Sequence, residues 1–128
     1  MIVLDASVLI GFMFEQDDHH GAAVSLLRNV VGAPLGVSQL TLAEVLVVPT
    51  RLHRLDAAEQ MLVDLGVTEV LLPSGASRRL AELRVETGLK LPDCCVLLTA
   101  QTVSGSLATF DDRLARETTS RGIEVIAA

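Results

Sequence analysis

Short apolar runs separated by helix-like stretches are the feature that most constrains the fold of this chain. The first run occupies residues 1–4 and ends at Asp5, as a buried strand does where it reaches a loop. Strands that are apolar throughout are covered on both faces, and strands that alternate with helices form a parallel sheet between helical layers. We therefore predict an α/β fold. Its strands are expected at residues 1–4, 35–38, 68–72, 106–110 and 124–126.

Helices are predicted between these strands from capping and helix-breaking residues. Asp17 or Asp18 is expected to cap one helix and Asp56 another, while Pro49 is expected to end the helix that begins at Thr41. No repeat, low-complexity tract or linker interrupts the pattern, so residues 1–128 are interpreted as one domain. The predicted helices cover residues 7–14, 17–31, 41–48, 56–66, 74–88, 94–103 and 112–120.

Half of the residues are hydrophobic, yet the chain has only three Phe and no Trp or Tyr, so its core must consist of Leu, Val, Ile and Ala. The apolar surplus predicts either a fully packed core or an exposed patch that a partner covers. Cys94 and Cys95 are adjacent, which disfavours a disulfide between them and predicts small buried side chains in a reducing compartment. No secretory signal and no apolar stretch of about 20 residues is visible, so we expect a cytoplasmic protein without a membrane segment.

The formal net charge of −6 argues against a protein that binds nucleic acid through a general basic surface. It does not exclude a nuclease, because a bound metal ion changes the local field of an acidic site. Lys90 is the only Lys, so nearly all the basic residues are Arg, the side chain suited to bidentate phosphate contacts. Biased codon usage explains this preference equally well.

Two acids stand where predicted strands end. Asp5 follows the first strand, and Asp111 follows the strand at residues 106–110. Ligand sites in open α/β sheets form beyond the carboxyl ends of the strands, so these side chains meet over one crevice if the two strands are neighbours. Each acid could equally be a helix cap.

Two further acids stand beside apolar helices. Glu44 lies in a segment that is apolar nearly all round, where an unpaired carboxylate is costly, although a capping box with Thr41 is an alternative. Asp93 precedes an uncharged apolar run and could be no more than its cap. Taken together, the four acids would repel one another strongly unless a cation lay among them. Carboxylate ligands without Cys or His indicate Mg²⁺ or Mn²⁺.

Other site chemistries find less support in the sequence. His19, His20 and His53 have no zinc-ligand spacing with cysteine and are predicted to be surface residues. No Gly-rich phosphate-binding loop occurs, and Ser7 is not part of a G-x-S-x-G nucleophile elbow.

Four sequence motifs together resemble those of PIN domains. They are I-V-L-D-A-S-V-L-I around Asp5, T-L-A-E-V around Glu44, L-P-D ending at Asp93 and L-A-T-F-D-D-R-L around Asp111. The short length and the N-terminal position of the first motif are similar to VapC-type toxins. Each motif is weak alone, but four in this order and spacing are specific, and the resemblance covers essentially the whole chain.

The resemblance implies a PIN-like three-layer α/β/α fold with a parallel sheet of about five strands in the order 3-2-1-4-5. That order would make the first and fourth strands neighbours, as a shared site for the two strand-end acids requires. The site residues that it implies are the catalytic and metal-binding acids Asp5, Glu44, Asp93 and Asp111, the alternate fourth acid Asp112, and the orienting hydroxyls Ser7 and Thr109.

The implied activity is Mg²⁺- or Mn²⁺-dependent endoribonucleolysis by the toxin of a type II toxin–antitoxin pair. The implied partners are an RNA substrate, a VapB-like antitoxin and a second copy of the chain in a homodimer. Two alternatives stay open: a catalytically silent PIN-like module that binds RNA or protein, and a nuclease directed at DNA or flaps, whose additional helices 128 residues would not accommodate. Candidates for RNA backbone contacts are Arg51, Arg54, Arg78, Arg79, Arg113 and Arg116.

Overall fold

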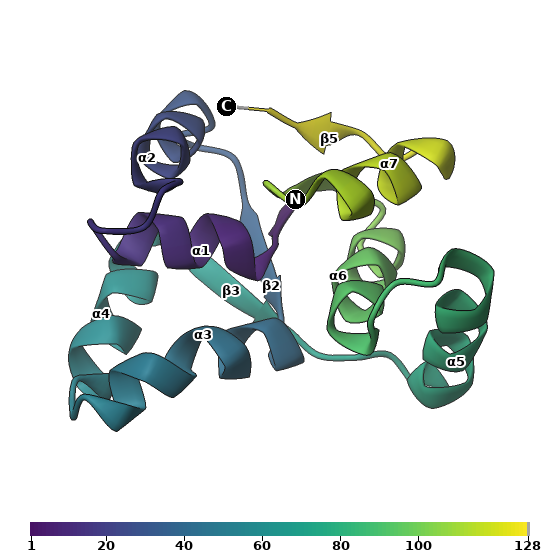
Figure 1. Ribbon diagram of the computed structural model, residues 1–128, viewed down its shortest axis with the longest axis horizontal. Helices are drawn as coiled ribbons and strands as arrows, with labels where there is room; N and C mark the ends of the chain where they lie inside the picture. The colour runs from purple at the N-terminus through teal and green to yellow at the C-terminus, as the bar shows by residue number, and fades with distance from the viewer. Residues whose placement is uncertain (128) are drawn as a thin grey trace.

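A five-stranded parallel sheet lies at the centre of the computed structural model, which describes residues 1–127 (Figure 1). The strands are β1 (Ile2–Leu4), β2 (Leu35–Ser38), β3 (Val67–Val70), β4 (Ser106–Ala108) and β5 (Val125–Ile126). Their spatial order is β3-β2-β1-β4-β5, which confirms the predicted order. The central strand β1 pairs with β2 on one side and β4 on the other, with Leu4 opposite Ala108.

Helices cover both faces of the sheet, which confirms the three-layer α/β/α prediction. Figure 1 shows α2 and α4 on one side of the strands and α5 and α6 on the other. The helices are α1 (Ala6–Met13), α2 (His20–Asn29), α3 (Gln39–Arg51), α4 (Leu55–Leu65), α5 (Ala76–Thr87), α6 (Leu91–Thr102) and α7 (Asp112–Ser120).

Alternate residues of the central strand pack into two separate hydrophobic cores, one on each face of the sheet. Ile2 and Leu4 belong to a cluster with α1 and α2, whereas Val3 belongs to a second cluster with α6 and Leu107 of β4. This follows from the two-residue period of a strand. Because both faces are covered, β1 is apolar throughout, as the sequence predicted.

The prediction that Pro49 ends its helix is wrong, because α3 continues to Arg51. A proline inside a helix removes one backbone donor, but here it stands in the last turns, where few helical hydrogen bonds remain. Pro49 is buried, its carbonyl accepts from the backbone N–H of Arg54 at 2.8 Å, and the Thr50 hydroxyl donates to the Leu46 carbonyl at 2.6 Å. Side-chain burial and these bonds keep the last turn helical.

Three predicted caps do not form in the expected way. The helix after Asp17 begins only at His20, and Asp17 instead accepts from the backbone N–H of His19 at 2.9 Å. Asp56 lies inside the first turn of α4. Asp93 lies inside the first turn of α6, which begins two residues earlier at Leu91. Negative charge in a first turn is favourable without a capping bond, so the sequence signal resembled that of a cap.

The two cysteines are free thiols with buried side chains, as expected of small apolar residues. No helix within residues 1–127 combines the length and the hydropathy that crossing a membrane requires.

Candidate active site

Asp5 lies at the carboxyl end of β1, where its backbone N–H donates to the carbonyl of Ala108 in the neighbouring β4. It occupies the N-cap position of α1, but its side chain makes no capping hydrogen bond. The carboxylate is buried and its Oδ2 accepts from the Ser7 hydroxyl at 2.8 Å and from the Thr109 hydroxyl at 2.7 Å. The interpretation of Asp5 as a simple helix cap is therefore wrong.

The Ser7 and Thr109 hydroxyls form a hydrogen-bond relay, in which each hydroxyl links a backbone N–H group to the Asp5 carboxylate. The N–H of Phe110 donates to the Ser7 hydroxyl, and the N–H of Asp111 donates to the Thr109 hydroxyl, both at 3.0 Å. Each hydroxyl has one proton, and each can give it to Asp5 because its lone pairs are the groups that accept from the backbone. The relay fixes the rotamer of the carboxylate and joins the start of the chain to residues 109–111. The backbone donors of this relay left no signal in the sequence.

Asp111 caps α7, since its Oδ1 accepts from the backbone N–H of Leu114 at 2.8 Å. The capping interpretation of Asp111 thus holds. The cap does not remove the side chain from the acidic cluster, because its charge raises the pKa of Asp93. Asp111 and Asp112 are both exposed, but Asp112 begins the helix and is not among the groups that shift this pKa. The electrostatics therefore favour Asp111 over Asp112 as the fourth acid.

Asp93 is the most perturbed acid of the cluster. Burial, followed by the charges of Asp5, Asp111 and Glu44, raises the pKa of Asp93 from 3.8 to about 6, and Lys90 lowers it in part. The structure therefore brings the four predicted acids into one electrostatic environment, although they come from four separate segments. Shifts of this kind occur at functional sites and in structural ion networks alike.

Glu44 stands on α3 but is exposed, so the prediction of a buried carboxylate on an all-apolar helix is wrong. Only one side of α3 is buried, through Thr41, Val45 and Pro49. Partial desolvation and the charge of Asp5 still raise the pKa of Glu44 above its usual value. The capping box is also absent, because α3 begins at Gln39 and the buried Thr41 hydroxyl has no hydrogen-bond partner within residues 1–127.

The donor set suits a hard divalent cation, but the carboxylates are not gathered into a finished coordination sphere. Among residues 1–127, no three His, Cys, Asp or Glu side chains are arranged to hold a metal ion. All four acids offer oxygen ligands, and the raised pKa of Asp93 shows that their charges oppose one another. The chemistry of the residues thus fits Mg²⁺ or Mn²⁺, and closing the sphere requires side-chain movement.

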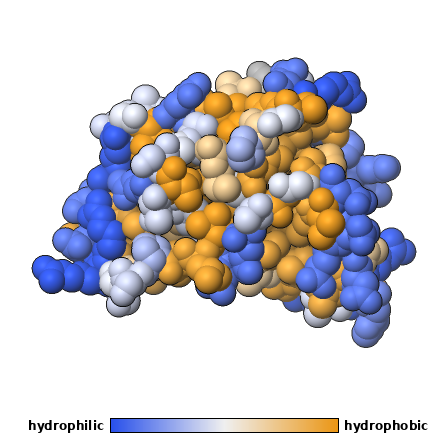
Figure 2. Space-filling model, turned by 180° about the vertical axis from the view of Figure 1, so that it is seen from behind, coloured by the Kyte–Doolittle hydropathy of each residue, from blue (hydrophilic) through white to orange (hydrophobic). Residues whose placement is uncertain are grey.

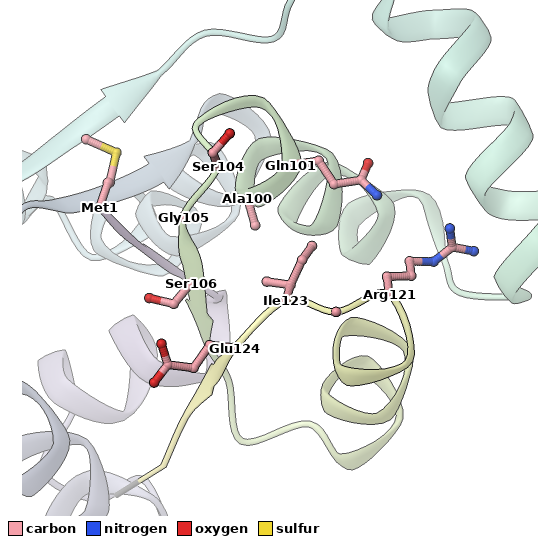
Figure 3. Close-up of a pocket in the computed structure, with 10 residues that line it drawn as sticks. Met1, Ala100, Gln101, Ser104, Gly105, Ser106, Arg121, Ile123 and Glu124 are labelled. Carbon is pink, nitrogen blue, oxygen red and sulfur yellow. The ribbon is translucent and has the colours of Figure 1, made fainter.

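A cavity of about 600 Å³ lies away from these acids. Met1, directly before β1, and Ser106, the first residue of β4, line it together with Gln101 and Arg121 (Figure 3). The cavity therefore lies at the amino ends of these strands, whereas Asp5 and Asp111 follow their carboxyl ends. None of the four acids contributes to its wall.

Two of the six Arg residues predicted to contact RNA already have partners within the chain. Arg79 forms an ion pair with Glu86 at 3.4 Å, and Arg113 donates to the carbonyl of Gly88 at 3.2 Å. They stabilise the region around the end of α5, which weakens their case as RNA contacts.

Replacing Thr109 by Val should destabilise the fold, because it removes one donor to Asp5 and leaves the Asp111 N–H without its acceptor. The loss of one buried, charge-linked hydrogen bond is expected to cost roughly 1–3 kcal/mol. Thermal melts in EDTA should therefore show a lower melting temperature for Thr109→Val. Thr109→Ser, which keeps the hydroxyl, is the matched control. Equal melting temperatures for Thr109→Val and the wild type would show that the relay is unimportant to the fold.

Comparison with known proteins gives a family and a fold. The family model described as PIN domain matches residues 2–118. No curated protein matches the chain significantly. Many solved structures do, at low identity, and likenesses of this kind concern the fold.

Three of these structures illustrate the likeness. A toxin–antitoxin complex from Klebsiella pneumoniae has a TM-score of 0.74 at 24% identity, covering 90% of each chain. The toxin VapC20 of Mycobacterium tuberculosis, described as cleaving the sarcin-ricin loop, has a TM-score of 0.75 at 18% identity, covering 91% of this chain and 95% of its own. FitAcB from Neisseria gonorrhoeae has a TM-score of 0.73 at 18% identity, covering 98% of this chain and 96% of its own.

Proposed function

Because this chain belongs to the PIN-domain family, whose members are generally nucleases, we propose that it is a metal-dependent endoribonuclease and the toxin of a type II toxin–antitoxin pair. The observation that carries the proposal is the buried Asp5 carboxylate at the carboxyl end of β1, which the Ser7 and Thr109 hydroxyls orient. The charges of Asp5, Asp111 and Glu44, which come from three other segments, also act on Asp93 and help to raise its pKa. Asp5, Glu44, Asp93 and Asp111 are the proposed catalytic and metal-binding residues.

The protein residues of this site orient and concentrate negative charge. Ser7 and Thr109 hold the Asp5 carboxylate in one rotamer, and the cap of α7 holds Asp111 beside it. Asp93, at the start of α6, completes a group of oxygen ligands that suits Mg²⁺ or Mn²⁺. Such an ion, when bound, would stabilise charge on the scissile phosphate and lower the pKa of an attacking water.

The proposed substrate and partner are based on the family and on the known activities and assemblies of proteins with the same fold. One neighbour is described as a toxin that cleaves the sarcin-ricin loop, and another is a toxin–antitoxin complex. We extend to this chain an RNA substrate and a VapB-like antitoxin. The buried free thiols Cys94 and Cys95 support placing it in the reducing cytoplasm.

The direct test incubates the purified chain with single-stranded RNA and with DNA of the same sequence, in Mg²⁺, Mn²⁺ or EDTA. We expect internal cleavage of the RNA only, and only with metal. Internal cleavage that survives EDTA would contradict metal dependence, and preferential cleavage of DNA would contradict the substrate.

A second candidate is a catalytically silent module that has kept the fold. One observation favours it, namely that no three acids within residues 1–127 are arranged to hold an ion. A metal titration followed by calorimetry separates the two functions. The proposed endonuclease must bind Mg²⁺ or Mn²⁺ and should therefore produce heat on titration. No heat with either ion would favour the binding module, in which the acids need not come together around a metal.

The chain is also expected to form a homodimer. Large apolar side chains are exposed on α4, on α3 and directly after α3, including Val48, Leu52, Met61 and Val63. Figure 2 shows apolar residues gathered over much of the reverse face. Apolar surface of this extent marks an interaction site more often than a free surface. Sedimentation at micromolar concentration should show a dimer, and a monomer throughout that range would contradict the expectation.

A further inference from the structure

Two aromatic rings are stacked next to the loop that carries Thr109 and Asp111. The rings of His19 and Phe110 have centroids 4.8 Å apart and planes inclined by 14°. Phe110 stands between Thr109 and Asp111, so its position is fixed by the same loop that orients Asp5. The stack therefore lies beside the site proposed to cut phosphodiester bonds.

One ring of the pair is set into the protein and the other faces outwards. Phe110 is partly buried against the core cluster of α1 and α2. The His19 side chain is 52% exposed. This exposure is what remains when one face of a ring is covered by a neighbour and the other is open to solvent. An open aromatic face is the surface on which nucleobases stack.

The position of His19 is fixed by the packing of α2 against α1. The backbone N–H of His19 donates to Asp17 at 2.9 Å, and the ring of His20 bonds to the carbonyl of Gly11 at 2.8 Å. A Cβ added to Gly11 would lie 3.2 Å from the His19 carbonyl and 3.3 Å from its Cβ. Gly11 thus allows an approach that a larger residue would hinder, and the His19 ring is held over Phe110 by its surroundings.

We propose that the His19–Phe110 stack is a platform for an unpaired base of the RNA strand that is cut at the acidic cluster. The proposal rests on the proposed endoribonuclease function and names the form of its substrate, which is single-stranded RNA. A base can stack only when it is splayed out of a helix, and stacking tolerates any base because each has a π face. The platform selects for single-strandedness rather than for sequence.

Two further features fit this arrangement. The chain has no Trp or Tyr and only three Phe, so a ring pair beside the acids is a large share of its stacking surface. A cavity of about 370 Å³ is lined by Glu44 together with Ile10, Phe14, Val45 and Val48. Asp17, which holds the His19 backbone, also lines that cavity. The segment that positions His19 therefore borders the same cavity as Glu44.

The test follows stacking directly with RNA hexamers that carry the fluorescent base 2-aminopurine at one position each. Stacking on an aromatic ring quenches this base. The Asp93→Asn variant, with Mg²⁺ present, is the parent protein, so that the RNA is bound and not cut. Total binding is measured in parallel from the anisotropy of an end-labelled hexamer.

Three variants are compared with this parent. His19→Asn removes the outer ring, and His53→Asn is the matched control, because His53 is exposed in the loop between α3 and α4 and its positive φ of 57° suits Asn. His19→Phe restores a ring without the imidazole. A base–aromatic stack is worth roughly 1–3 kcal/mol, which corresponds to a dissociation constant raised about 5- to 150-fold. We expect quenching at one hexamer position, lost in His19→Asn and kept in His19→Phe and His53→Asn.

The outcomes separate this proposal from the proposed function. RNA that binds by anisotropy without quenching at any position, or with equal affinity for the parent and His19→Asn, overturns the platform and leaves the nuclease proposal standing. An absence of RNA binding in both measurements also overturns it. Quenching by a protein whose wild type cleaves no RNA with either metal keeps the platform and overturns the nuclease proposal. Stronger quenching of the matching DNA hexamers overturns RNA as the occupant.

Discussion

Asp93→Asn should reduce RNA cleavage by on the order of a hundredfold or more while leaving the circular dichroism spectrum unchanged. The carboxylate is the most perturbed of the cluster, since burial and three neighbouring acids raise its pKa to about 6. Asn has nearly the same shape but carries no charge, so it should bind a hard cation much more weakly. Initial rates on a labelled RNA substrate in Mg²⁺ and Mn²⁺ measure the loss.

Asp111→Asn and Asp112→Asn serve as a matched pair for the same assay. Asn is as good a helix cap as Asp, so Asp111→Asn should keep α7 intact. We expect a large loss of cleavage from Asp111→Asn and a small one from Asp112→Asn. The reverse ranking would assign the fourth acid to Asp112, and full activity of Asp93→Asn would remove that residue from the site.

The second large effect concerns stability, because the carboxylates oppose one another when no cation is bound. Metal at about one hundred times its dissociation constant should stabilise the wild type by roughly 2.7 kcal/mol, on the order of ten degrees in melting temperature. Asp5→Asn should melt higher than the wild type in EDTA and gain much less from metal. The Asn oxygen can still accept from Ser7 and Thr109, so the variant removes charge and keeps the relay.

The same melts should depend on pH. The pKa of Asp93 is raised on folding from 3.8 to about 6, so the folded chain binds a proton more tightly than the unfolded chain. The contribution of Asp93 to the free energy of unfolding is fully stabilising below pH 4 and is lost as the pH rises through 6. Because Asp93 is only partly buried, solvent screening limits it to about 1 kcal/mol. The gain from metal should accordingly be larger at pH 7.5 than at pH 5, and equal gains at both would contradict the repulsion.

The sheet order was predictable from sequence because four short motifs resemble one family, and the central strand β1 was predictable because it is apolar on both faces. The helix boundaries were harder to predict from the sequence. Pro49 was expected to end α3, but its burial and the bonds around it keep the last turn. Local residue preferences do not include such tertiary contacts.

The four acids were predicted by residue number, whereas their surroundings were not. Glu44 was expected to be buried because its neighbours are apolar, but exposed apolar side chains such as Val47 and Val48 line α3. The hydroxyl relay depends on backbone N–H groups, which every residue except proline has and which therefore leave no pattern. The stack of His19 on Phe110 joins distant segments through one close helix packing at Gly11, and no spacing rule predicts it.

The relay that orients Asp5 also sets when the site can first exist during protein synthesis. The hydrogen bond from Thr109 to Asp5 joins residues 104 positions apart, and the central strand β1 waits equally long for β4. At about 5 to 20 residues per second, roughly 5 to 20 seconds separate the making of these two residues. During that interval the nascent chain carries Asp5 without the partners that hold it. The Asp5 carboxylate therefore has its orienting donors only when the chain is nearly complete, and a product truncated before Thr109 could not form this arrangement.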